Sequence, residues 1–225
     1  MTEYAINKTK SDVYYIQKIM PEQAGLPGIW ENIPVINIAK YPWDENGYKP
    51  RVEAGVFYTD THLHLRFKAY ESKIRAECRD LNDMVCRDSC MEFFFNPNPG
   101  NDDRYLNFEI NPIGSLLLYI GKDRYGRTPA VTQKDLKAFN ILTSVARETL
   151  EAYNGPYWEV TWRIPFDYLE RYYGKLDFCA GKRMKANFYK CGDKTEFPHY
   201  ACWNNIVIDT PDFHRPEFFG DLVLA

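Results

Sequence analysis

Four segments of the sequence mix aromatic rings with carboxylate, amide and basic side chains. They are residues 88–95, 105–111, 186–193 and 212–220. This combination suits sugars, because their C–H faces lie against aromatic rings while their hydroxyls hydrogen-bond to the planar groups of Asp, Glu, Asn and Arg. The chemistry that the segments predict is recognition of a polyhydroxylated small molecule.

We expect the outward-facing members of these segments, with one nearby tryptophan, to form a single pocket. The candidate ligand-binding residues combine ring platforms with hydroxyl-binding groups: Glu92, Glu109, Asn111, Tyr189, Lys190, Trp203, Phe213, His214 and Arg215. An alternative interpretation is structural. It places Phe93, Phe95, Phe108 and Phe188 in the core and has Asp88, Asn111 and Arg215 hold loops together.

A second hypothesis is a glycoside hydrolase. Such enzymes use two carboxyl groups roughly 5 to 10 Å apart on either side of the glycosidic bond. Glu92 and Glu109 lie in separate strand candidates and are the available pair. No feature of the sequence raises the pKa of one carboxyl above the other, so binding without catalysis is favoured.

A third hypothesis is a haem or metal site, because the chain has four histidines: His62, His64, His199 and His214. His62 and His64 share one strand face, but that face also carries Arg66 and Lys68 and is expected to be wet. The six cysteines lack the paired spacing of a structural zinc site and are expected to be free thiols. Residues 44–47 and 101–103 lack the spacing of an EF-hand calcium loop. We expect no cofactor.

The elements that must position these residues are strands. Alternation of apolar and polar side chains over 62–69, 105–110 and 158–164 is typical of half-buried strands in antiparallel sheets. Further candidates are residues 13–19, 52–58, 90–95, 115–120, 140–147, 184–189 and 221–224. One short helix is expected over 166–173, with Pro165 before its first turn and Gly174 after its last. The predicted fold is an all-β antiparallel sandwich with one helix.

Composition narrows the function classes. The 225 residues carry 28 basic and 31 acidic side chains without a block of like charge, which argues against nucleic acid or an anionic membrane as partner. Residues 1–10 are polar, and no segment approaches a membrane span, so we expect a cytoplasmic protein. The length and the absence of a long linker predict a single domain over 1–225.

The ordered set of motifs resembles carbohydrate-binding family 9 and its stand-alone bacterial relatives, within a DOMON-like group. It includes Trp30, the acidic strand at 88–95, the segments 157–160 and 164–166, and the closing 218–220. The resemblance implies a β-sandwich that binds sugar between two tryptophans without catalysis. By position, Glu92 matches the acidic sugar ligand and Phe213 falls near one stacking tryptophan.

This chain also departs from the family pattern. Residues 84–87 contain no tryptophan where the second stacking ring is expected, and Glu109 stands where the family has a sugar-binding arginine. The departures imply either a different ligand or a pocket rebuilt from other side chains. Candidates for that rebuilt pocket are Tyr105, Tyr189, Trp203 and His214.

Overall fold

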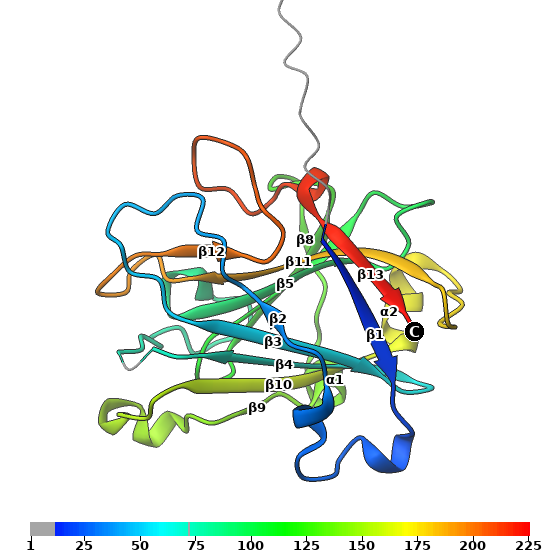
Figure 1. The fold of residues 1–225 in the computed structure, drawn as a ribbon, viewed down its shortest axis with the longest axis horizontal. Coiled ribbons are helices and arrows are strands. Elements are labelled where there is room, and N and C mark those ends of the chain that lie inside the picture. The colour runs from blue at the N-terminus through cyan, green and yellow to red at the C-terminus, as the bar shows by residue number, and fades with distance from the viewer. Residues whose placement is uncertain (1–11, 72) are drawn as a thin grey trace, which may run out of the picture.

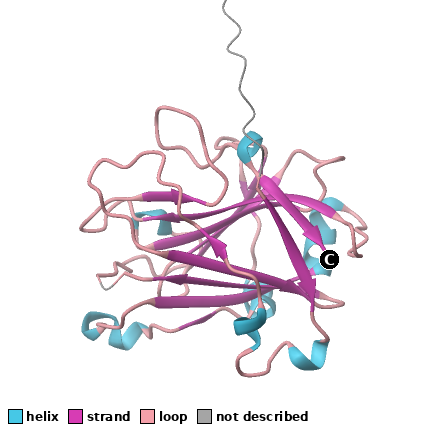
Figure 2. Cartoon of the chain, in the orientation of Figure 1, coloured by secondary structure: helices cyan, strands magenta, loops and turns pink. Residues whose placement is uncertain are grey.

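The computed structural model describes residues 12–71 and 73–225 (Figure 1). Residues 1–10, whose polar character supports the expectation of a cytoplasmic protein, lie outside the described residues. Within the described part, the fold is dominated by β-strands, and the helices are short pieces at the periphery (Figure 2). The predicted all-β class is confirmed.

The strands join into one curled sheet. Their order is β8-β7-β6-β5-β11-β13-β1-β3-β4-β10-β9, with β12 added to β11 and β2 added to β3. The bounds are β1 Val13–Lys18, β2 Ile36–Asn37, β3 Val52–Tyr58, β4 His62–Ala69, β5 Cys90–Asn96, β6 Tyr105–Ile110, β7 Leu116–Gly121, β8 Thr128–Pro129, β9 Leu142–Thr143, β10 Trp158–Pro165, β11 Arg183–Cys191, β12 Tyr200–Cys202 and β13 Gly220–Leu224.

Strand β1 joins the two halves of this sheet. Its residues 13–16 pair in parallel with β13, and its residues 17–18 pair in parallel with β3. The other strand pairs are antiparallel, so the sheet is mixed, and the expectation of a wholly antiparallel arrangement is wrong at β1. Parallel and antiparallel partners leave the same alternation in a single strand, which is why the pattern did not reveal the difference.

The two halves of the sheet face one another across the main core. Phe67 of β4 and Phe188 of β11 meet there, with their ring centroids 5.8 Å apart. Alternate residues of each strand fill this layer, as period 2 requires. The phenylalanines that the structural alternative assigned to the core, Phe93, Phe95, Phe108 and Phe188, all lie in it with exposures of 0–1%.

Helix α2 spans Phe166–Tyr173 with the predicted bounds, and Gly174 follows it at a φ of 72°. The expectation of a single helix is wrong, because α1 spans Gln133–Phe139. A capping box between Thr132 and Asp135 begins α1 and was its signal in the sequence. The predicted strand at 140–147 is reduced to the two residues of β9.

The remaining helical pieces are short 3-10 helices. They are η1 Pro21–Gln23, η2 Ile29–Asn32, η3 Val85–Arg87, η4 Arg147–Ala152 and η5 Pro216–Phe218. Across the described ranges, no helix has the length and apolar character needed to cross a membrane.

Candidate functional site

A second buried cluster lies on the outer face of β5, β6 and β11, on the side of the sheet away from the main core. Alternation sends the even-numbered residues of β5 and the odd-numbered residues of β6 and β11 to this face. Long loops cover it, including residues 203–219, whose Phe213 and Phe219 pack into the cluster. Side chains of this face are therefore buried without belonging to the main core.

The loops do not fill this face completely. They leave a cavity of about 350 Å³. It is lined by Trp43, Met84, Cys86, Glu92, Glu109, Leu117, Tyr119, Arg124, Arg127, Cys191, Asp193, Tyr200, Pro211, Asp212, Phe213 and His214. Rings, carboxyl groups and guanidinium groups thus converge on one space.

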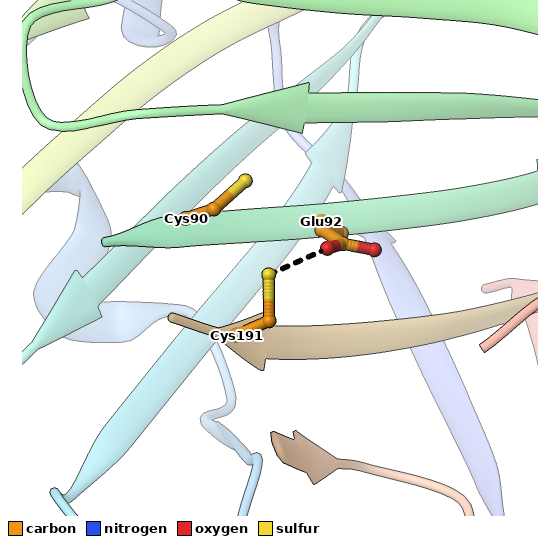
Figure 3. A group of neighbouring side chains, drawn as sticks. All are labelled: Cys90, Glu92 and Cys191. Atoms are coloured by element: carbon orange, nitrogen blue, oxygen red, sulfur yellow. Dashed lines mark hydrogen bonds between the residues drawn. The ribbon is translucent and has the colours of Figure 1, made fainter. Parts of the chain in front are cut away.

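Two carboxyl groups form the floor of the cavity. Glu92 of β5 and Glu109 of β6 are directly opposed in the antiparallel register, and both side chains are buried. Glu92 accepts a hydrogen bond of 2.9 Å from the Cys191 thiol (Figure 3), and Glu109 accepts one of 2.8 Å from the Asn107 amide. Among the described residues, neither glutamate forms an ion pair with a lysine or arginine.

Burial without a bonded cation raises the pKa of both groups. Burial and the charge of Glu109 raise the pKa of Glu92 well above its usual range. Burial raises the pKa of Glu109 to about 7, against the opposing hydrogen bond from Asn107. The pair therefore holds at least one proton near neutral pH, so it can donate a hydrogen bond as well as accept several.

Aromatic rings form one wall. Phe213 stacks on Tyr189 with centroids 4.1 Å apart and an interplanar angle of 9°, and the Tyr189 hydroxyl donates to the Phe213 carbonyl. Trp43 lies 5.8 Å from Phe213, and Tyr200 meets both rings edge-on. Tyr189 therefore supports the Phe213 ring from behind, and Phe213 presents a fixed apolar surface to the cavity.

Two arginines reach the cavity from the loop after β7. Arg124 forms an ion pair of 2.6 Å with Asp212. The Arg127 side chain packs against Gly121, where a Cβ would lie 2.6 Å from its Cγ, and its buried Nη1 atom has no hydrogen-bond partner. An unpartnered guanidinium nitrogen is an available donor for a ligand.

A histidine completes the lining. The Tyr105 hydroxyl and His214 Nδ1 are 2.8 Å apart. Burial and the charges of Arg127 and Arg124 lower the pKa of His214 to about 2, so its ring is neutral. A neutral imidazole has one protonated and one unprotonated nitrogen, and Nδ1 shares its hydrogen bond with the Tyr105 hydroxyl.

The structure brings together part of the predicted site. Glu92, Glu109, Phe213 and His214 line the cavity, and Tyr189 supports Phe213 from behind. Asn111, Lys190, Trp203 and Arg215 do not line it.

Lys190 and Trp203 lie on the core side of the sheet. Lys190 is adjacent to Tyr189 in β11, and neighbours in a strand point to opposite faces. Its ammonium is fully buried and pairs with Glu71 at 2.8 Å. Trp203 packs edge-on against Phe188 in the main core.

Asn111 and Arg215 make the bracing contacts that the structural alternative describes. The Asn111 amide donates to the Asp88 carboxylate at 3.0 Å and to the Cys78 carbonyl at 2.9 Å. Arg215 pairs with Glu217, two residues further along the chain, at 2.6 Å.

Several lining residues were not among the candidates from the sequence: most of them lie in loops, and Tyr119 and Tyr200 lie in β7 and β12. They are Trp43, Tyr119, Arg124, Arg127, Asp193 and Tyr200. Two arginines in the turn 122–127 were a signal for a basic group. The sequence held no signal for Trp43, because its segment reaches the cavity only through tertiary packing. The Trp43 indole donates a hydrogen bond to the Ile208 carbonyl. Met84 and Cys86 line the cavity where the family pattern has a tryptophan.

The histidines do not gather into one site. His62 and His64 lie side by side on β4, and His64 stacks on Phe57 at 4.5 Å. His199 is bonded to the buried Lys190, and His214 lies in the cavity. Among the described residues, no group of three metal-ligating side chains includes a histidine.

A curled β-sheet with a loop-covered cavity of rings and carboxyl groups is typical of small-ligand binding domains. The chain belongs to carbohydrate-binding family 9, whose family model matches residues 28–224. It is also similar to a putative carbohydrate-binding protein from Bacteroides uniformis, with 30% identity, a TM-score of 0.82 and coverage of 96% of this chain and 100% of that one.

Two further structures share the fold. Both are family 9 carbohydrate-binding modules from Caldicellulosiruptor kristjanssonii. The complex with glucose has 13% identity, a TM-score of 0.61 and coverage of 95% and 96% of the two chains. The complex with cellotriose has 12% identity, the same TM-score and coverage of 95% and 93%. No curated protein matches the chain.

Proposed function

We propose that this protein binds a carbohydrate at the cavity above Glu92 and Glu109 and does not transform it. The observation that carries the proposal is the convergence of a rigid aromatic wall with two buried carboxyl groups on one cavity. Membership of family 9 and the glucose and cellotriose complexes of two structures with this fold support the ligand class.

The cavity suits a small part of a saccharide. Its volume of about 350 Å³ lies near the lower end of the usual range for ligand sites, which favours one or two sugar rings. In this proposal one sugar face stacks on Phe213 with Trp43 beside it, while Glu92 and Glu109 bond vicinal hydroxyls. Arg127 supplies a further donor through Nη1.

The placement of the carboxyl groups supports binding over hydrolysis. A glycosidase needs its acid and its nucleophile or base on opposite sides of the scissile bond. Glu92 and Glu109 are cross-strand neighbours on one floor, so both address a ligand from the same side. We also propose that the whole fold is a two-layered β-sandwich that acts as a single binding module.

The test is calorimetric titration with glucose, cellobiose, cellotriose and a wider panel of mono- and oligosaccharides. We expect saturable binding by the natural chain and a loss of about tenfold in Glu92→Gln and Phe213→Ala, because the first removes a buried carboxyl group that bonds the ligand and the second removes a stacking ring. Phe197→Ala is the matched control, because Phe197 is an exposed ring that does not line the cavity.

The same samples separate binding from catalysis. Incubation with each oligosaccharide is expected to release no new reducing ends. Binding that survives in both cavity variants would place the ligand elsewhere. Release of reducing ends that disappears in Glu109→Gln would replace this proposal with a hydrolase.

A further inference from the structure

We propose that Cys90, Glu92 and Cys191 form a site for one zinc-type divalent ion in the floor of the cavity. One ligand atom from each residue lies within 4.8 Å of the other two, and all three side chains are buried (Figure 3). This site shares Glu92 with the proposed sugar site, but metal binding is tested without sugar and does not depend on the proposed function.

The strand register builds this group. Cys90 and Cys191 are directly opposed on β5 and β11, and Glu92 is the next residue of β5 on the same face. Cys191 Sγ already lies 2.9 Å from the Glu92 carboxylate. Zn–S bonds of about 2.3 Å and Zn–O bonds of about 2.1 Å hold tetrahedral ligand atoms roughly 3.5 to 3.8 Å apart. The three atoms therefore need only small side-chain rotations to surround an ion.

The local charges favour a cation. The cavity is lined by four carboxyl groups, those of Glu92, Glu109, Asp193 and Asp212, against the two guanidinium groups of Arg124 and Arg127, and Arg124 is paired with Asp212. Binding of the ion displaces the thiol protons and any proton on Glu92 into solvent.

The ligand set also indicates the kind of metal and its coordination. Two thiolates select zinc over calcium or magnesium, which prefer oxygen ligands. Cys90 is fully buried, but Glu92 and Cys191 line the cavity. Three protein ligands thus come from the floor, and a fourth position faces the cavity for water or a ligand hydroxyl. Cysteine spacing did not predict the site, because Cys90 and Cys191 meet only through the sheet.

The test uses the full chain, reduced, stripped of metal and free of sugar. It is titrated with Zn²⁺ by calorimetry and with Co²⁺ by absorption spectroscopy. We expect one ion per chain and a thiolate-to-cobalt charge-transfer band. X-ray absorption of the zinc complex is expected to show two sulfur ligands. A folded, reduced protein that binds no ion, or a bound ion without sulfur ligands, would overturn the proposal.

Variants locate the site. Cys90→Ser, Cys191→Ser and Glu92→Gln should each lower zinc affinity more than about tenfold, since even changes outside the ligand set cost tenfold or more. Cys179→Ser should bind as the natural chain does, because Cys179 is an exposed thiol outside the group. Loss of the cobalt band in Cys86→Ser but not in Cys90→Ser would contradict the assignment. If a serine variant does not fold, the cobalt band and the X-ray absorption of the natural chain still test the proposed ligands.

Discussion

Two buried polar groups lie on opposite faces of the half of the sheet that contains β5, β6 and β11, and they differ in how their charge is balanced. On the core side, the Lys190 ammonium bonds Glu71 at 2.8 Å, the His199 ring at 2.8 Å and the Cys191 carbonyl at 2.8 Å. Glu71 also accepts bonds from the Trp158 indole and the Ser89 hydroxyl. On the cavity side, Glu92 and Glu109 oppose one another without a bonded cation.

The pKa shifts show the consequence of this difference. The charge of Lys190 lowers the pKa of Glu71 although burial acts in the opposite direction. Burial prevails at Glu92 and Glu109, whose pKa values rise. A fully bonded ion pair closed off from solvent belongs to the scaffold, whereas a buried pair with spare bonding capacity beside a cavity is suited to a ligand.

Removal of the Lys190 ammonium is expected to have the largest effect on the free energy of unfolding. Lys190→Met leaves the Glu71 carboxylate buried without its cation and should lower the free energy of unfolding by about 3 to 5 kcal/mol. Urea unfolding measures this change in the free energy of unfolding. The double variant Lys190→Met with Glu71→Gln should recover part of the loss, because the uncompensated charge is gone. A single-variant loss below about 1 kcal/mol would mean that the cluster does not stabilise the scaffold.

Glu109 predicts a pH dependence of stability. Its folded pKa of about 7 lies above its usual value, so the folded state holds the proton more tightly than the unfolded chain. The stabilising contribution is present below about pH 4.5 and is lost as the pH rises to about 7, with a total on the order of 3 kcal/mol. Glu109→Gln should flatten this part of the curve of unfolding free energy against pH. An unchanged curve would show that Glu109 does not cause this pH dependence.

His199 predicts the opposite slope for the core-side cluster. Burial and the charge of Lys190 lower its pKa to about 4, so the folded state holds the proton less tightly than the unfolded chain. Its contribution is present above about pH 6.5 and is lost as the pH falls towards 4, with a total on the order of 3 kcal/mol. Comparison of His199→Gln with the natural chain by thermal unfolding across this range tests the slope. A variant with the same acid sensitivity would contradict it.

The smallest effect is expected at Arg215. Its ion pair with Glu217 is solvent-exposed and local, so Arg215→Ala should change the free energy of unfolding by less than about 0.5 kcal/mol. Because Arg215 does not line the cavity, saccharide affinity should also stay within about twofold in calorimetry. A large loss of affinity would extend the site beyond the cavity.

Alternation in the sequence located the long strands well. The segments 62–69, 105–110 and 158–164 match β4, β6 and β10 closely, because burial of one sheet face imposes a period of two on the residues. The same rule separates Tyr189 from Lys190, since neighbouring residues of β11 cannot share a face. Grouping residues by chemical type alone placed both in one pocket. Helix α1 was missed because it is short and only its capping box marks it.

The sequence by itself determined the all-β class and the strand faces, including those that carry Glu92 and Glu109, because these follow from local periodicity and residue type. Only the tertiary structure decided that β1 pairs in parallel, that Trp43 and Arg127 reach the cavity, and that Cys90 meets Cys191. Those features depend on which distant strands and loops come together. Strand pairing and loop packing are set by the whole chain, and no single segment carries their pattern.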